Sequence, residues 1–178
     1  MNKKFILPVL AASAVAAFAP TAMAQDAMNY DIKHTYFAID AQSVDFDGTG
    51  GNEYGALNFA AGVRANRNLG FEAAYFITEE NDFGVNEFWA HGVTADVIGY
   101  LPVTNDDRFE VLGNVGIALT RFETNGGDNT DIGLRLGVGA QYHINDKWAA
   151  RARINYTETD EGGIDDYTTV SIGGAYKF

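Results

Sequence analysis

Nucleophilic chemistry in this chain would depend on a small set of side chains. Beyond residue 24 the serines are Ser43 and Ser171, the histidines are His34, His91 and His143, and the whole chain has no cysteine. Covalent catalysis needs a nucleophile next to a base that activates it. The pattern pairs no serine with a histidine, and it contains no phosphate-binding Gly-rich loop, paired-carboxylate signature or metal motif. The sequence therefore predicts no catalytic site, no metal site and no cofactor.

Charged residues form a separate group. They occur in segments where apolar residues alternate with small or charged ones, and they share one face of these segments with glycine and alanine. The set comprises Asp40, Arg64, Glu72, Asp96, Glu110, Arg135, Arg151, Arg153 and Lys177. Four acids thus meet five bases. An isolated charge removed from water costs several kcal/mol, whereas matched and hydrogen-bonded pairs are tolerated. We expect a salt-bridge network that fills the interior; the alternative is a narrow water-filled pore lined by the same residues.

The elements that position these charges are eight alternating segments of about ten residues, the length of strands that span a membrane. They are expected at Lys33–Val44, Tyr54–Ala65, Leu69–Glu79, Phe88–Leu101, Phe109–Phe122, Ile132–Ile144, Trp148–Thr157 and Tyr167–Phe178. The connections are alternately long and short, with loops at 80–87 and 123–130 among the long ones. This pattern predicts an all-β fold, an eight-stranded antiparallel transmembrane β-barrel with both termini at the short-turn end.

One segment has an irregular outer face. If Asp96 faces inward, then Trp89, Val93 and Val97 face outward, but so does the polar residue His91. A β-bulge between these positions would reverse the parity.

The long-loop end of the predicted barrel is strongly acidic. Its acids are Asp45, Asp47, Glu53, Glu79, Glu80, Asp82, Glu87, Glu123, Asp128, Asp131, Glu158, Asp160, Glu161, Asp165 and Asp166. Arg121 is the one base among them. Divalent cations prefer several carboxylate and carbonyl oxygens, so cation binding is one interpretation and a solvated surface is the other. The net charge of −12 disfavours nucleic acid as a partner.

The N-terminus predicts export. Met1-Asn2-Lys3-Lys4 is a basic region, residues 5–20 are apolar, and Ala22-Met23-Ala24 fits signal-peptide cleavage. A membrane anchor is the alternative, although the apolar run is short and interrupted by prolines. We expect a signal peptide at 1–24, a short segment at 25–32 and the barrel domain at 33–178.

With the leader, the eight strands and the ending Tyr176-Lys177-Phe178, the chain resembles small eight-stranded bacterial outer-membrane proteins, namely the OmpA-type transmembrane domain, OmpX and the opacity-like barrels. The resemblance implies a monomer in the bacterial outer membrane with a polar packed interior and periplasmic short turns. It implies contacts with outer-membrane lipid and lipopolysaccharide. It also implies that Tyr176 and Phe178 belong to a C-terminal signal for the barrel-assembly machinery.

The sequence leaves three functions open, of which the resemblance implies the first. The first is a structural or surface protein with a largely closed interior, acting in envelope integrity or surface interaction through acidic external loops. The second is a narrow channel for small solutes or hydrophobic molecules. The third is a lipid A-modifying enzyme, which some barrels of this size are, and which the sparse serines and histidines disfavour.

Overall fold

A computed structural model describes residues 34–46, 53–79, 81–83, 86–124, 127–159 and 166–178. The predicted signal peptide and the segment 25–32 lie outside the described residues, so their boundaries stay predictions. No helix in the described part of the chain is long and apolar enough to cross a membrane.

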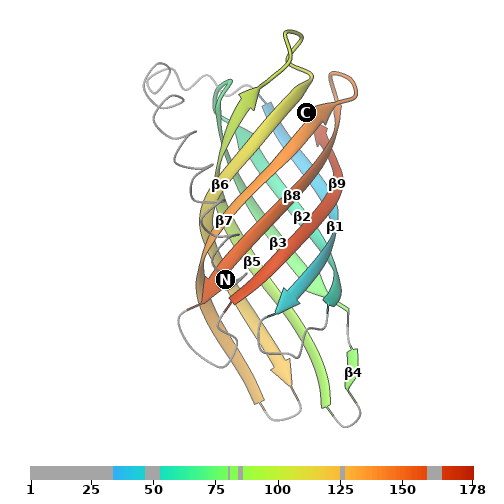
Figure 1. Cartoon of the computed structure of the whole chain (residues 1–178), viewed down its shortest axis with the longest axis vertical. Coiled ribbons are helices and arrows are strands. Elements are labelled where there is room, and N and C mark those ends of the chain that lie inside the picture. Colours follow the sequence, from blue (N-terminus) through green and yellow to red (C-terminus); the bar gives the residue numbers. More distant parts are fainter. Residues whose placement is uncertain (1–33, 47–52, 80, 84–85, 125–126, 160–165) are drawn as a thin grey trace, which may run out of the picture.

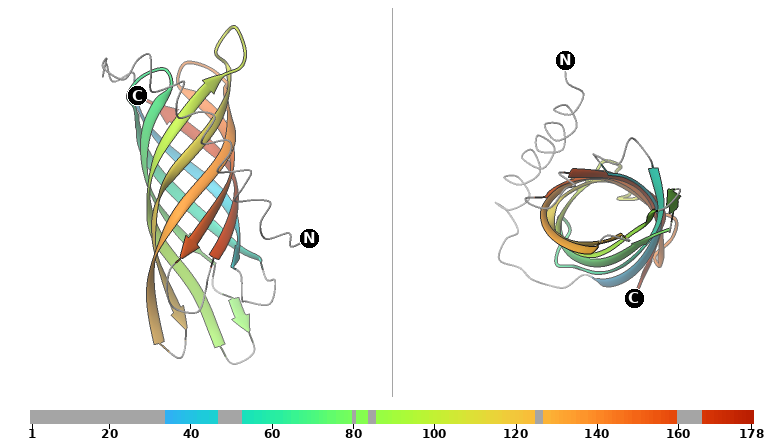
Figure 2. Two further views of the ribbon diagram at one scale, coloured as in Figure 1. Left: turned by 60° about the vertical axis from the view of Figure 1, so that its left-hand side comes forward. Right: turned by 90° about the horizontal axis from the view of Figure 1, so that it is seen from below.

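The chain forms one closed sheet of antiparallel strands. The strands are β1 (His34–Phe46), β2 (Glu53–Arg64), β3 (Leu69–Thr78), β4 (Asn81–Phe83), β5 (Asn86–Pro102), β6 (Phe109–Thr124), β7 (Gly127–His143), β8 (Trp148–Thr159) and β9 (Asp166–Lys177). The order around the sheet is β3-β2-β1-β9-β8-β7-β6-β5, and pairing of β3 with β5 closes the ring (Figures 1 and 2). Among the described strands, the short β4 pairs with β5 alone. The predicted barrel of eight spanning strands is confirmed.

Two predicted loops are wrong in part. β4 and the start of β5 occupy most of 80–87, and the ladder between β6 and β7 continues to the pair Thr124 and Gly127. The Gly, Asn and Asp residues of 123–130 are poor strand formers, but a paired neighbour outweighs intrinsic preference in a sheet. Because β7 begins at Gly127, Asp131 is an inward strand residue, 4% exposed, and does not belong to the acidic loop surface.

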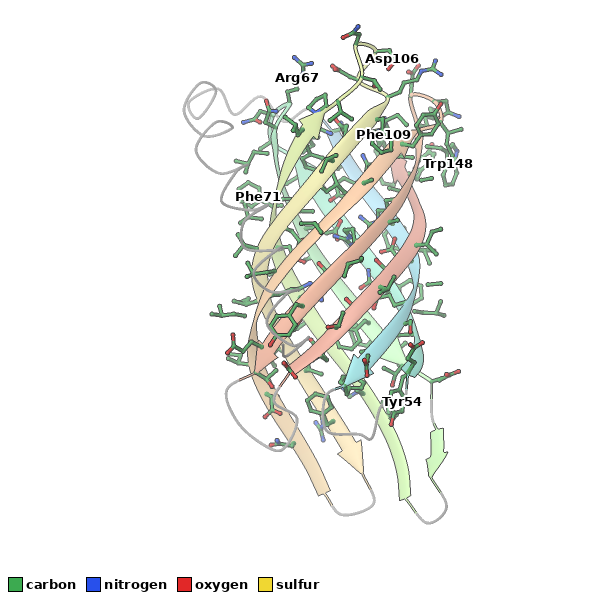
Figure 3. The ribbon with its side chains drawn as sticks, viewed as in Figure 1. Tyr54, Arg67, Phe71, Asp106, Phe109 and Trp148 are labelled. Atoms are coloured by element: carbon green, nitrogen blue, oxygen red, sulfur yellow. The ribbon has the colours of Figure 1, made fainter. Side chains whose placement is uncertain are left out.

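The outer face of the barrel is apolar, as the predicted membrane position requires. Figure 3 shows Phe71, Phe109 and Trp148 projecting outward from the strands. The pairing of β5 with β3 and β6 runs without interruption past His91 and Asp96. Asp96 is buried inside and His91 faces out, so no bulge reverses the parity of this strand.

The interior is more aromatic than expected. The sequence pattern indicated small residues interrupted by single charges, but a buried cluster of larger side chains fills the long-loop end of the lumen. It consists of Val44, Phe46, Tyr54, Ala56, Ala90, Phe122 and Tyr167. Phe46 lies beyond the predicted end of its strand, whereas the other six residues occupy inward positions within the predicted strand ranges.

Candidate functional site

The centre of the lumen holds a compact cluster of charges around Arg151 of β8. Arg151 donates to both oxygens of Asp40 on β1, from Nε at 2.8 Å and from Nη2 at 2.6 Å. Its Nη1 donates to Glu72 Oε2 on β3 at 2.6 Å. Arg153, two residues further along the same face, places Nη2 2.8 Å from Glu72 Oε1. All four side chains are at most 3% exposed, so these charges are neutralised by one another.

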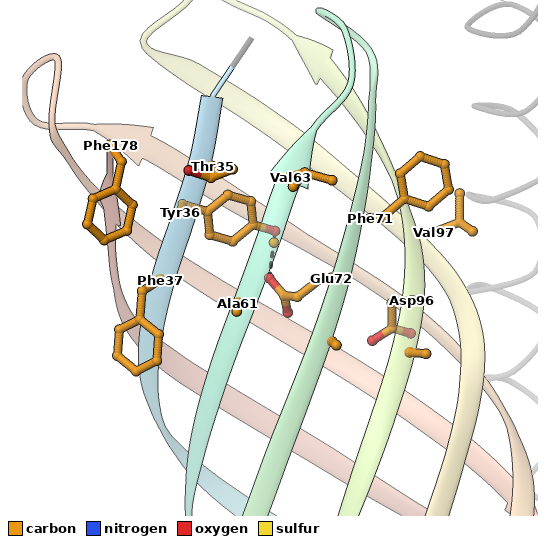
Figure 4. A pocket seen from close by; sticks show the side chains of 13 residues that line it. Thr35, Tyr36, Phe37, Ala61, Val63, Phe71, Glu72, Asp96, Val97 and Phe178 are labelled. Carbon is orange, nitrogen blue, oxygen red and sulfur yellow. Dashed lines mark hydrogen bonds between the residues drawn. The ribbon is translucent and has the colours of Figure 1, made fainter. Parts of the chain in front are cut away.

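Neutral side chains complete this central cluster. Asn58 donates its amide to Asp40 Oδ2 at 2.9 Å, and the Tyr36 hydroxyl donates to Glu72 Oε2 at 2.7 Å (Figure 4). The Tyr36 ring lies over Gly62, its cross-strand partner, where any Cβ atom would collide with it. A glycine beneath a tyrosine thus allows the phenol to reach the carboxylate.

A second cluster lies at the short-turn end. Arg64 of β2 and Glu110 of β6 form a two-pronged pair with both N–O distances at 2.8 Å. The Arg64 guanidinium also lies 4.0 Å from the centre of the Tyr100 ring. His143 Nε2 lies 2.9 Å from Glu110 Oε2. This carboxylate is therefore bound from two strands.

Lys177 joins that second cluster indirectly. Its Nζ lies 3.3 Å from His143 Nδ1, and no carboxylate of the described residues lies within ion-pair distance of it. Lysine can only donate, so Nδ1 of His143 accepts and Nε2 carries the hydrogen donated to Glu110. Of the nine predicted network residues, Lys177 is the one that the structure leaves outside direct pairing with an acid.

A third group of charges, around Asp96 and Arg135, has fewer hydrogen bonds. Arg135 Nε lies 3.4 Å from Asp96 Oδ2 without forming a hydrogen bond, while Asn114 donates to Asp96 Oδ1 at 3.0 Å. The side-chain oxygens of Asn114 and Asn155, together with Nε and Nη1 of Arg153, are buried without a hydrogen-bond partner among the described residues. These atoms make this level of the lumen polar.

Aromatic side chains lie between this polar level and the long loops. Phe46 packs against Tyr54, Phe122 and Tyr167 with ring centroids 5.3 to 5.5 Å apart. The hydroxyl of Tyr167 on β9 is 3.0 Å from that of Thr120 on β6. The lumen is thus filled by ionic pairs toward the short turns and by rings toward the long loops.

The potential nucleophiles are dispersed. Ser171 donates to the Arg153 carbonyl oxygen inside the barrel, and Ser43 donates to Glu53 at the long-loop end. His143 lies at the short-turn end, and the outward-facing His91 is three strands from Ser43, about 14 Å at 4.7 Å per strand. No described serine is therefore positioned for activation by a histidine.

Metal ligands do not gather in the described part of the chain either, where no group of three His, Asp or Glu side chains could hold an ion. Many of the acidic loop residues, including Asp47, Glu80 and Asp160, lie outside the described residues, so cation binding by the loops stays a prediction.

The predicted assembly residues lie on the outer face at the short-turn end. Tyr176 packs edge-on against Trp148 with centroids 4.9 Å apart and against Phe178 with centroids 5.2 Å apart. Phe178 is 76% exposed, and its backbone N–H donates to the Thr35 carbonyl oxygen of β1. The last residue therefore takes part in the seam between the first and last strands.

Comparison with known proteins identifies the same architecture. A family model described as an outer membrane protein beta-barrel domain matches residues 5–178. No curated protein sequence matches the chain. The solved structure of Neisserial surface protein A (NspA) has a TM-score of 0.69 and 18% identity, covering 81% of this chain and 97% of that one.

Two further solved structures are similar. Ail, the attachment invasion locus protein of Yersinia pestis, has a TM-score of 0.56 and 17% identity, covering 82% of this chain and 97% of its own. The N-terminal β-barrel domain of OprF from Pseudomonas aeruginosa has a TM-score of 0.57 and 12% identity, covering 80% and 97%. Identities this low show a shared fold and say nothing about individual residues.

Proposed function

The chain belongs to the outer membrane protein β-barrel family and lies in the bacterial outer membrane, and on that premise we propose that it is a structural surface protein whose lumen is closed by its own side chains. Its role is in envelope integrity or surface interaction, with the long loops as the contact surface and no enzymatic activity.

The observation that carries this proposal is the ion pair between Arg151 and Glu72. β8 and β3 are fourth neighbours in the ring of eight long strands, so this pair crosses the full width of the lumen. Arg64 and Glu110 cross between third neighbours, as do Thr120 and Tyr167 at the aromatic level. An eight-stranded barrel has room for little more than its side chains, and contacts across it at three levels oppose solute passage.

A liposome-swelling assay tests the closed lumen. Vesicles that contain the protein are placed in isotonic solutions of a pentose or a small amino acid, beside vesicles with a general porin. We expect swelling no faster than in protein-free vesicles. Swelling at the porin rate would instead support the narrow-channel alternative.

The proposed orientation places the short turns in the periplasm and the long loops outside the cell, as is usual for such barrels. The chain has no cysteine, so a single introduced cysteine can be labelled selectively to determine the orientation. Asn129→Cys, exposed on the lumen side at the long-loop end, should react with an impermeant maleimide on intact cells, whereas Asp106→Cys in a short turn should react only after the outer membrane is permeabilised.

The proposed partners follow from the same placement. The chain acts as a monomer embedded in outer-membrane lipid and lipopolysaccharide, and its last strand, with Tyr176 and Phe178, engages the barrel-assembly machinery. The outward position of both rings at the seam of the barrel supports this proposal. Divalent cations at the acidic loops are part of the proposal as well.

A further inference from the structure

One polar patch faces outward, on the membrane-facing surface near the long loops. His91 of β5 is the cross-strand partner of Arg121 of β6. Trp89 stacks on the His91 ring, with centroids 4.8 Å apart and an interplanar angle of 25°. The next outward residues toward the short turns are Val93 and Leu119, 52% and 44% exposed. The patch therefore lies at the upper border of an apolar surface.

The height of the patch can be estimated from β5 itself. Leu101, the last outward apolar residue of β5, is ten residues beyond His91. With a rise of about 3.3 Å per residue and a strand tilt of about 40°, the two are separated by about 25 Å along the barrel axis. The apolar band of outer-membrane barrels has the same height. His91 and Arg121 thus lie where the acyl chains end and the lipid headgroups begin.

From this placement we propose that Arg121, His91 and Trp89 form a binding site for a phosphate group of lipopolysaccharide in the outer leaflet. The planar guanidinium of arginine matches phosphate geometry, and its five N–H donors serve a ligand beside contacts within the protein. The imidazole supplies another donor, and an indole suits the border between apolar and wet surroundings. The inference rests on the proposed orientation, with the long loops outside.

One further observation favours a lipid phosphate over a soluble anion. The apolar surface formed by Val93 and Leu119 directly below the patch accepts acyl chains. An amphiphile whose phosphate is joined to acyl chains can therefore contact the patch and this surface together, which a soluble anion cannot.

The surroundings of His91 also suit a ligand-binding site. Its Nδ1 is buried and makes no hydrogen bond with the described residues. Stacking on Trp89, with Tyr75 at 6.2 Å on β3, orients the ring in place of a hydrogen bond through that nitrogen. Because Nδ1 is covered, the Nε2 side of the outward ring is the one that can donate to a ligand at the headgroup level.

Fluorescence tests the site, because the chain has only two tryptophans. In a Trp148→Phe background, Trp89 is the sole reporter. The full-length mature protein in zwitterionic detergent micelles is titrated with purified lipopolysaccharide. We expect a saturable change in Trp89 emission, an apparent Kd at least tenfold higher for Arg121→Ala, and a smaller increase for Arg121→Lys. Arg67→Ala, an exposed arginine at the opposite end, is the matched control and should bind like the parent.

Ligand variants identify the chemistry. Dephosphorylated lipopolysaccharide and inorganic phosphate alone should give no saturable change. Equal binding of the dephosphorylated lipid, or an unchanged Kd in Arg121→Ala, would overturn the site. Heat-modifiable gel mobility checks that each variant is folded, and His91→Gln carries the test if Arg121→Ala does not fold. The titration detects binding at the outer face only, so a lumen that conducts solutes would leave its result unchanged. Failed labelling of Asn129→Cys would separately refute the orientation.

Discussion

Arg151 and Glu72 meet across the barrel from opposite strands, with Nη1 and Oε2 2.6 Å apart. The same guanidinium binds Asp40 through its other two nitrogens. One side chain on β8 thereby links three strands of the wall. Burying these ions is costly, and the cost is met only while every partner is present. The cluster therefore fixes the distance between opposite walls and crosses the lumen between them.

Removal of the central cation should be strongly destabilising. Arg151→Ala leaves Asp40 and Glu72 buried without their main partner, which corresponds to a loss of about 3–5 kcal/mol in the free energy of unfolding. Urea unfolding in detergent or lipid vesicles measures it. Arg153→Ala should cost less than Arg151→Ala, and Arg135→Ala least, because Arg135 makes no hydrogen bond through Nε.

The control for these variants is Arg108→Ala. Arg108 pairs with Asp106 at 3.5 Å on the exposed surface, where ion pairs contribute about 0–1 kcal/mol. Unchanged urea midpoints for all three lumen arginines would show that the interior network does not stabilise the barrel.

The tyrosine above Gly62 gives a steric prediction. In Gly62→Ala the new Cβ would overlap the Tyr36 ring, which must move away from Glu72, at a cost of about 1–3 kcal/mol. Gly174→Ala is the matched control on β9, since its nearest neighbour would be 3.7 Å away. Denaturant midpoints that fall equally for both variants would contradict this role of the glycine.

The aromatic level should behave as a packed core. Phe46→Ala removes a ring that three others contact, and we expect a loss of about 3–5 kcal/mol in unfolding free energy. Phe46→Leu preserves most of the volume and should cost less than about 1.5 kcal/mol. A similar midpoint for the two variants would indicate that the rings are not closely packed.

The Arg64–Glu110 pair predicts energetic coupling. In a double-mutant cycle with Arg64→Ala and Glu110→Ala, each variant loses unfolding free energy. The sum of the two single losses should exceed the loss in the double variant by about 0.5–3 kcal/mol. The two hydrogen bonds of 2.8 Å between them supply this coupling. Additive losses would mean that the residues act independently.

Much of the architecture follows from residue alternation. Tyr167 to Phe178 alternates apolar and small or polar residues, and in the structure the apolar set faces outward as predicted. Likewise, once Asp96 was placed inside, alternation along the strand correctly predicted that His91 faces outward. Period two determines which side of a sheet a residue occupies, and in a closed barrel that side is either lipid or lumen.

The partners of the lumen charges could not be predicted in the same way. Arg151 contacts Asp40, 111 residues away in the sequence, and Glu72, 79 residues away. Such pairs form only if residues on strands that are not neighbours lie at the same level along the barrel axis. The shear of the closed sheet sets these levels. The first predicted strand ended before Phe46, although the parity of Phe46 agrees with that of Asp40. Tyr54, Phe122 and Tyr167 lay at inward positions of the predicted strands, but their packing around Phe46 depends on strands that are distant in the sequence.

Single-channel recording in planar bilayers tests the closed lumen most directly, with the wild-type protein beside an Arg151→Ala, Arg153→Ala double variant. The closed barrel predicts no steady, discrete openings from the pure wild-type protein, and infrequent openings in the variant that lacks the central cations. Steady openings of uniform size from the folded wild-type protein would contradict the closed lumen and identify a channel.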